Sequence, residues 1–208
     1  MGAKLRLMVT TQQAAEPDDR GLVESIRQGD VDSFETLVRR KTSKVYALCY
    51  RVIGNAEDAK DISQLVFLKL WENLEKYDPR YAFDTWLYRM VTNVAIDFLR
   101  NRQSREAAVN SNLRLVKTAT DEDQSVNVQR KEIETVFHEV SAVLSPKQKA
   151  IFVMREMEDL QSSEIARILG CRESTVRNHL FNARKLMQDQ LKKRFPEYSR
   201  LWRKNDAV

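Results

Sequence analysis

The chain has 208 residues, of which 42% are hydrophobic and 31% are charged, and its formal net charge is +5. This length allows one large or two small domains with a hydrophobic core, and five glycines and four prolines are too few for a turn-rich β architecture. The positive balance permits a nucleic-acid partner without proving one.

The two cysteines, Cys49 and Cys171, lie far apart in apolar settings, so we expect buried, reduced thiols. No CxxC pair or Cys/His cluster is present, so the sequence predicts neither a metal site nor a cofactor. The start "MGAKLRLMVT" does not resemble a secretory signal, and the longest apolar stretch, "QLVFLKLW", is too short to span a bilayer. We therefore expect a cytoplasmic protein that does not insert into a membrane.

In chain order, a polar and mobile tail over residues 1–19 precedes a short helix over residues 22–28. Asp32 and Glu35 stand three apart, which predicts a capping box for the helix that carries "FETLVRRKTSKVYALCYRVI". Gly54 is expected to end that helix.

Asn55 is a good N-cap for the third helix, "AEDAKDISQLVFLKLWENLEKY", which should stop at Asp78-Pro79. A loop, "DPRYAFD", then leads into a long helix, "TWLYRMVTNVAIDFLRNR". From about Glu106 the periodicity fails, and an acidic cluster at residues 121–123 indicates a linker.

Apolar periodicity resumes at Val128, and Ser145, Pro146 and Gln148 give a strong helix-start signal for "PKQKAIFVMREME". "SSEIARILG" and "ESTVRNHLFNARKLM" follow as two more helices, and a polar tail begins at Pro196. The predicted fold class is all-α: an N-terminal helical bundle and a C-terminal helix-turn-helix domain, both small, joined by a flexible linker.

The last helix places one aromatic side chain on its polar side. Val176, Leu180, Ala183 and Met187 share a core face, whereas Phe181 falls opposite them. With the preceding helix and the turn at Gly170, this is a helix-turn-helix pattern, whose second helix reads bases from the major groove. The residues expected to face bases are Glu173, Ser174, Arg177, Asn178 and Phe181.

From Arg172 to Arg194 the sequence has seven Lys or Arg and only two acids, which favours phosphate contacts. An apolar ring such as Phe181 can touch a thymine methyl group, which would explain its place on the polar side. The alternative is a pair of packed helices with a solvated, charged face. Arg172 stands where a Ser or Thr N-cap would be expected.

The long helix of the N-terminal half also pairs an aromatic residue with cations opposite its core stripe. Its polar side carries Trp86, Arg89, Asn93, Asp97 and Arg100. Further aromatic residues lie in the preceding loop, namely Tyr77, Tyr81 and Phe83. Exposed rings and cations suit single-stranded nucleic acid. The alternative is that Trp86 and the loop rings pack over a neighbouring helix.

The helix that follows Asn55 is apolar nearly all round. Beside its core side it has a second, mixed stripe that suits docking onto partner helices, formed by Asp61, Gln64, Leu65, Leu68, Trp71 and Glu72. The alternative is a helix buried in the centre of its own bundle.

Three stretches together resemble a bacterial RNA polymerase sigma factor of the extracytoplasmic-function (ECF) group of the sigma-70 family. They are "NAEDAKDISQLVFLKLW", "AFDTWLYRMVTNVAIDFLRNR" and "LSPKQKAIFVMREMEDLQSSEIARILGCRESTVRNHLFNARKLM". The resemblance covers residues 20–192 and implies two conserved domains. It divides the chain into a tail (1–19), region 2 (20–105), a linker (106–127), region 4 (128–195) and a second tail (196–208).

The resemblance implies a transcription initiation factor rather than an enzyme, with core polymerase (the β′ clamp helices and the β flap), promoter DNA and an anti-sigma factor as partners, and with no need for a homo-oligomer. The implied polymerase contacts are Asp61, Gln64, Leu65, Leu68 and Trp71. The implied contacts with the melted minus-ten element are Tyr77, Tyr81, Phe83, Trp86, Arg89, Asn93, Asp97 and Arg100. Those with the minus-thirty-five duplex are Arg172, Glu173, Ser174, Thr175, Arg177, Asn178, Phe181, Asn182 and Lys185.

Two positions depart from the family pattern: Leu65 stands where an acid is common, and Asn182 where Arg is frequent. Two rival functions remain open at this point. One is a helix-turn-helix regulator that binds its operator unaided, and the other is a helical adaptor or enzyme. No nucleophile–base pair, metal cluster or glycine-rich loop supports the second rival. The sequence does not indicate the promoter, the regulon or the inducing signal.

Overall fold

The computed structural model describes residues 18–110 and 128–198, and all regular structure in these two ranges is helical. Most of the two predicted tails and most of the predicted linker, with its acidic cluster, lie outside the described residues. The expectation that the first tail runs to residue 19 is wrong at its end, because Asp18 caps α1 and Asp19 begins it. The elements are α1 (Asp19–Arg27), α2 (Val31–Ile53), α3 (Ala56–Asn73), the short 3-10 helix η1 (Leu74–Lys76), α4 (Phe83–Asn110), α5 (Val128–Ser141), α6 (Pro146–Glu156), α7 (Ser162–Leu169) and α8 (Glu173–Arg194).

Local capping explains most helix ends. Asn55 accepts a hydrogen bond from the Asp58 N–H at the start of α3, and Ser145 forms the predicted capping box with Gln148. The expected capping box at Asp32 is wrong, because Asp30 caps α2 instead and its carboxylate accepts hydrogen bonds from the backbone N–H groups of Asp32 and Ser33. An acidic residue directly before the first helical residue satisfies N–H groups that a residue inside the helix cannot reach.

Gly54 ends α2 as predicted, with a left-handed φ of 82° and its N–H bonded to the Tyr50 carbonyl. The long helix α4 exceeds its predicted length at both ends, beginning at Phe83 and continuing to Asn110. It therefore takes in the first residues that the sequence assigns to the linker. An exposed helix end and a loop both lack apolar periodicity, so the sequence pattern does not distinguish them.

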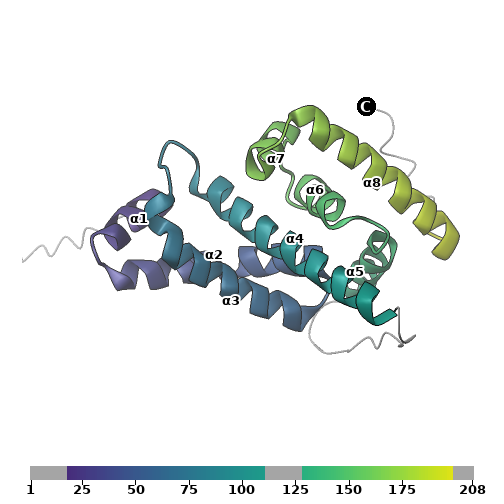
Figure 1. Cartoon of the computed structure of the whole chain (residues 1–208), viewed down its shortest axis with the longest axis horizontal. Coiled ribbons are helices and arrows are strands. Elements are labelled where there is room, and N and C mark those ends of the chain that lie inside the picture. The colour runs from purple at the N-terminus through teal and green to yellow at the C-terminus, as the bar shows by residue number, and fades with distance from the viewer. Residues whose placement is uncertain (1–17, 111–127, 199–208) are drawn as a thin grey trace, which may run out of the picture.

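The helices form two groups that lie side by side (Figure 1). We call α1–α4 with η1 the N-terminal group and α5–α8 the C-terminal group. Helix α4 runs through the middle of the molecule, packing on α2 and α3 on one side and on α6 and α7 on the other, while α8 lies beyond α6 (Figure 1). The buried apolar residues of both groups form one continuous cluster.

Within the described residues, no helix has the length and apolar character needed to cross a membrane. The same part of the chain contains no group of three or more His, Cys, Asp or Glu side chains that could hold a metal ion.

Candidate nucleic-acid interface

Helix α4 presents three different faces. Leu87, Val91 and Ala95 are buried in the core of the N-terminal group. Tyr88, Thr92 and Ile96 follow one another at four-residue spacing and form a second buried stripe, from which the Tyr88 hydroxyl donates to Glu158 of the C-terminal group. The third face is exposed and carries four polar side chains, Arg89, Asn93, Asp97 and Arg100, beside the half-buried Trp86. Of the predicted minus-ten residues in this helix, Arg89, Asn93, Asp97 and Arg100 thus share one open face, and Trp86 lies half-buried beside it.

The ion pair on the exposed face of α4 is weak. The Arg100 guanidinium lies 3.8 Å from the Asp97 carboxylate, and both side chains are mostly in solvent. Such a pair contributes about 0.5 kcal/mol or less, so a phosphate group can replace the carboxylate at little cost.

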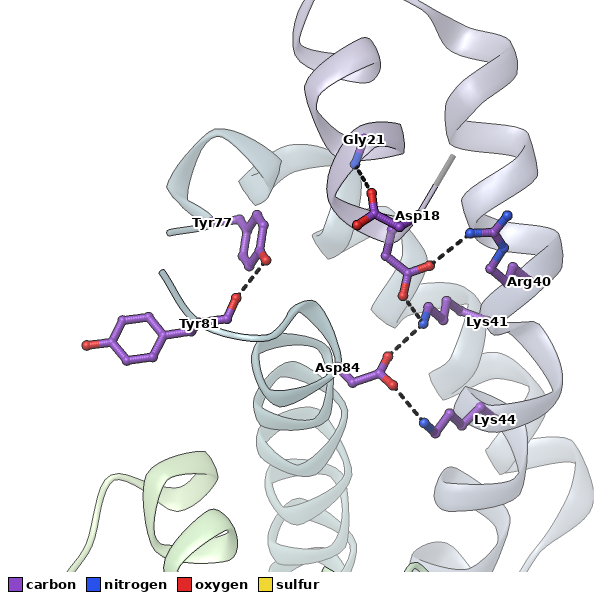
Figure 2. A network of polar contacts seen from close by, with 9 residues as sticks. Asp18, Gly21, Arg40, Lys41, Lys44, Tyr77, Tyr81 and Asp84 are labelled. Carbon is purple, nitrogen blue, oxygen red and sulfur yellow. Dashed lines mark hydrogen bonds and ion pairs between the residues drawn. The ribbon is translucent and has the colours of Figure 1, made fainter. Parts of the chain in front are cut away.

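The aromatic residues before and at the start of α4 divide into two kinds. Tyr77 and Phe83 are buried and pack against each other and against Trp86, with ring centroids 5.4 to 6.0 Å apart. The expectation that both rings are exposed is therefore wrong, and the alternative, packing over the helix, holds for them. Tyr81, by contrast, is 56% exposed, and its ring points away from the loop (Figure 2). Of these rings, Tyr81 is the most exposed, and Trp86 is half-buried.

A network of polar contacts holds the start of α4 (Figure 2). Asp84, in its first turn, receives the Lys41 ammonium at 2.7 Å and the Lys44 ammonium at 2.8 Å. Lys41 also donates to Asp19, the first residue of α1. Burial opposes the charged form of Asp84, but its hydrogen bonds to the two lysines outweigh burial and lower the pKa of the carboxyl group.

Helix α8 presents its outer face as predicted. Phe181 is 67% exposed, while Val176, Leu180 and Ala183 are buried on the opposite side. The predicted minus-thirty-five residues are all exposed or partly exposed, namely Arg172, Glu173, Ser174, Thr175, Arg177, Asn178, Phe181, Asn182 and Lys185.

Two contacts organise this face in the free chain. Arg177 donates to the Glu173 carboxylate at 2.6 Å, and the Asn182 amide donates to the Asn178 side chain at 3.4 Å. Both pairs join residues four apart on one helix, so they align their side chains along the face.

The turn before α8 has the geometry of a helix-turn-helix. Gly170 adopts a left-handed φ of 60° at the end of α7, and the Cys171 N–H bonds back to the Ala166 carbonyl at 3.0 Å. Ile165 and Ala166 are buried with Val176 and Leu180, as expected, but Ile168 replaces Leu169 as the fully buried residue.

Helix α3 leaves an apolar stripe uncovered. Leu68 is 63% exposed, Leu65 and Trp71 are also exposed, and Asp61 and Gln64 continue the stripe. The alternative, a helix buried on all sides, is therefore wrong. Sequence reasoning missed Phe34 of α2, whose ring meets that of Trp71 edge-on at 4.7 Å, and the exposed Val31, one turn earlier in α2. Their spacing of three residues at the start of α2, outside its core face, was the available signal.

Two family models match the chain over its two helical groups. The model described as Sigma-70 region 2 matches residues 37–105, and that described as Sigma-70, region 4 matches residues 136–187. A relative from Haemophilus influenzae, the ECF RNA polymerase sigma-E factor, is 32% identical over 86% of this chain and 97% of its own length. The chain belongs to the ECF group of the sigma-70 family.

Other similar proteins agree with this membership. The ECF RNA polymerase sigma factor SigW of Bacillus subtilis is 28% identical over 82% of this sigma factor and 95% of SigW. Among solved structures, CnrH in complex with the cytosolic domain of CnrY superposes with a TM-score of 0.62 at 21% identity, over 85% of this chain and 98% of that one. At this identity the likeness shows the fold. As a sigma factor, the protein is a transcription initiation factor that directs RNA polymerase to promoters.

The sigma factor also has a seam between its two groups of helices that the sequence did not indicate. Glu158, which follows α6, is 11% exposed; it pairs with Arg51 of α2 and accepts a hydrogen bond of 2.8 Å from the Tyr88 hydroxyl of α4. The next residue, Asp159, has a φ of 53° and is the one non-glycine residue with positive φ in the described ranges. Burial and the Glu158 carboxylate together raise the pKa of Tyr88, so its hydroxyl keeps the proton that it donates.

A histidine closes the other end of the seam. His138 of α5 packs edge-on against Tyr50 of α2, with ring centroids 5.1 Å apart, and its Nδ1 would lie 3.0 Å from a Cβ placed on Gly54. Both ring nitrogens are buried without a hydrogen-bond partner among the described residues. Burial, helped by the Lys149 charge, lowers the pKa of His138 to about 4.

Proposed function

We propose that this sigma factor binds core RNA polymerase through α3, captures the melted minus-ten element with α4 and reads the minus-thirty-five duplex with α8. The proposal rests on one observation: α4 and α8, in separate helical groups, each leave a face with cations uncovered, with the exposed ring of Tyr81 just before α4 and that of Phe181 on α8. The proposed domains are region 2 over residues 20–105 and region 4 over residues 128–195, joined by residues 106–127.

Polymerase binding is assigned to the stripe of Asp61, Gln64, Leu65, Leu68 and Trp71. Clustered exposed apolar side chains flanked by polar ones are typical of a protein–protein interface. We propose the β′ clamp helices as the main partner of this stripe and the β flap as a partner of region 4. Leu65, at a position where family members commonly have an acid, makes the stripe more apolar and leaves one charge contact unavailable.

Minus-ten capture is assigned to Tyr81 and Trp86 with the polar face of α4. Stacking on a ring contributes about 1 to 3 kcal/mol per base, which is comparable to the few kcal/mol needed to unstack and unpair one. Binding alone can therefore drive local melting. We propose that the protein acts in the cytoplasm by binding, without a catalytic step of its own and without a cofactor or metal.

Control by an anti-sigma factor is a further part of the proposal. CnrH was solved with the cytosolic domain of CnrY, and another solved neighbour, with a TM-score of 0.58, is the sigma factor RpoE with the anti-sigma factor NepR from Bartonella quintana. The uncovered stripe of α3 gives such a regulator an apolar surface on which it would compete with polymerase.

The deciding experiment is run-off transcription with purified core polymerase and a library of genomic promoters. We expect transcripts that depend on the added chain, and no tight binding of the chain alone to the same promoters in a gel-shift assay. Tight, specific binding without polymerase would instead favour a stand-alone helix-turn-helix regulator.

A pair of variants tests the polymerase surface. Leu68→Glu should weaken core binding roughly ten-fold or more, because it places a charge in the centre of an apolar contact. Ile133→Glu is the matched control, since Ile133 of α5 is 64% exposed and lies outside the stripe. Equal core binding by both variants in a pull-down assay would refute the assignment to α3.

A further inference from the structure

The loop between η1 and α4 is tied at its beginning to α1. Arg27, the last residue of α1, donates from one guanidinium nitrogen to the carbonyl oxygens of Leu74 and Glu75, each at 3.2 Å, and of Tyr77 at 2.6 Å. These carbonyls lie at the end of η1, where the Leu74 carbonyl also accepts the Tyr77 N–H, and Arg27 gives those of Glu75 and Tyr77 a donor as well. The point at which the chain leaves η1 is therefore set by a residue about 50 positions earlier.

The same loop is tied at its end to the other terminus of α1. Lys41 bridges Asp19, the first residue of α1, and Asp84 in the first turn of α4 (Figure 2). Between the two ties, the Tyr77 hydroxyl donates to the Tyr81 carbonyl at 2.7 Å and fixes the turn from within. Hydrogen bonds and ion pairs thus connect both ends of the loop to α1.

Lys41 differs from Lys44 although both bind Asp84. The Lys41 side chain is 9% exposed, whereas that of Lys44 is 44% exposed. Burial disfavours the Lys41 charge, but its contacts with Asp19 and Asp84 outweigh burial and raise its pKa. A buried cation between two carboxylates holds a defined geometry. Asp19 also pairs with Arg40 and Asp84 with Lys44, but Lys41 is the cation that joins the two acids to each other. An exposed pair contributes little.

We propose that α1 and Lys41 form a brace that positions the loop over residues 77–83 so that Tyr81 and Trp86 can capture unpaired minus-ten bases. Arg27 and Lys41 are positioning residues in this scheme, because neither needs to touch DNA. The inference rests on the proposed function for its role in melting, and on the contacts above for the brace itself.

The brace is tested first in the free, full-length chain by hydrogen exchange. In Lys41→Met and in Arg27→Gln, amides of residues 77–86 should exchange about ten-fold faster, while those of α8 are unchanged. Lys44→Met is the matched control, removing a cation from the same carboxylate, and should change exchange by less than about two-fold. Unchanged exchange in the loop of both brace variants would overturn the proposal. The two variants act at opposite ends of the loop, so the test can be made with either variant if the other does not fold.

The role in melting is tested with the reconstituted holoenzyme on a promoter from the transcription experiment. We expect Lys41→Met to slow the conversion of closed to open complex about ten-fold while changing closed-complex affinity less than about two-fold, since α8 is untouched. Lys41→Arg, which can fork between two carboxylates, should recover most of the rate. A variant that only lowered the folded fraction would reduce both quantities together.

The outcomes separate the two proposals. If the loop loosens but opening is not slowed, the positioning role is wrong and the proposed function stands. If the wild-type holoenzyme opens no promoter, the proposed function fails whatever the exchange data show.

Discussion

Phe181 exposes two thirds of a large apolar ring on a helix face otherwise formed by polar and cationic side chains. It makes none of the core contacts of its neighbour Leu180, so folding does not require it. We propose that the ring contacts a thymine methyl group of the promoter.

The Phe181→Ala variant should therefore leave stability almost unchanged and weaken promoter-dependent transcription. Losing one apolar base contact of about 1 kcal/mol corresponds to a roughly five-fold loss of affinity. The matched control is Leu180→Ala, which empties a buried site and should cost about 2 to 5 kcal/mol of folding free energy. Thermal unfolding and run-off titration measure the two effects. An unchanged promoter titration for Phe181→Ala would remove this ring from the interface.

His138 makes stability depend on pH in a direction that its burial determines. Its pKa is lowered to about 4, so the unfolded chain, with a pKa near 6.5, binds its proton first as the pH falls. The stability associated with the neutral ring is present above pH 6.5 and is lost progressively down to about pH 4. The charge that faces it, Lys149, acts in the same direction.

Between pH 6.5 and 5, the wild type should lose about 2 kcal/mol more stability than His138→Phe, which cannot titrate. Urea unfolding at the two pH values gives this difference. Proton NMR offers a control, because one of the two imidazole signals should stay unprotonated to below pH 5 and vanish in the variant. Identical pH dependence in both proteins would show that His138 is solvated.

At the scale of elements, α8 begins with a cation at a position where a capping side chain would make the helix more stable. Arg172 occupies the N-cap with extended backbone angles but makes no side-chain cap hydrogen bond. The missing acceptor leaves the first N–H groups of the helix to solvent or, in a complex, to a DNA phosphate.

Arg172→Ser should stabilise the protein by about 0.5 to 1 kcal/mol by supplying the cap. The same change should weaken duplex binding and reduce the salt slope by about one unit, because one phosphate contact is lost. Chemical denaturation and salt titration of holoenzyme–promoter binding measure the pair of effects. A gain in stability with no change in the salt slope would show that Arg172 does not contact phosphate.

The helices could be predicted because their signals are local. Periodic apolar residues and caps such as Asn55 and Ser145 act within one or two turns, and the structure has them where the sequence indicates. The seam could not be predicted, because Glu158 meets partners 70 and 107 positions away and looks like any surface acid in sequence. The brace was missed for the same reason, since Lys41 falls in a helix rich in cations.

For the whole molecule, the seam determines how compact the free chain is. Glu158→Gln keeps the shape of the side chain but removes the charge that Arg51 faces, so the two groups of helices should separate and the radius of gyration should rise. Glu156→Gln is the matched control, because Glu156 pairs with Arg184 inside the C-terminal group. Small-angle scattering compares the two. Superimposable curves for Glu158→Gln and wild type would mean that apolar packing alone holds the seam.

Because Gly54 lies against His138, a substitution at Gly54 can measure how closely the two groups of helices pack. A methyl group added here strains a left-handed residue and also wedges against the imidazole, whereas at Gly29, with a φ of 95° and nothing within 4 Å, it causes only the strain. The difference in unfolding free energy between Gly54→Ala and Gly29→Ala therefore isolates the wedge. If the same difference is measured with polymerase bound, its loss would show that polymerase separates the two groups of helices.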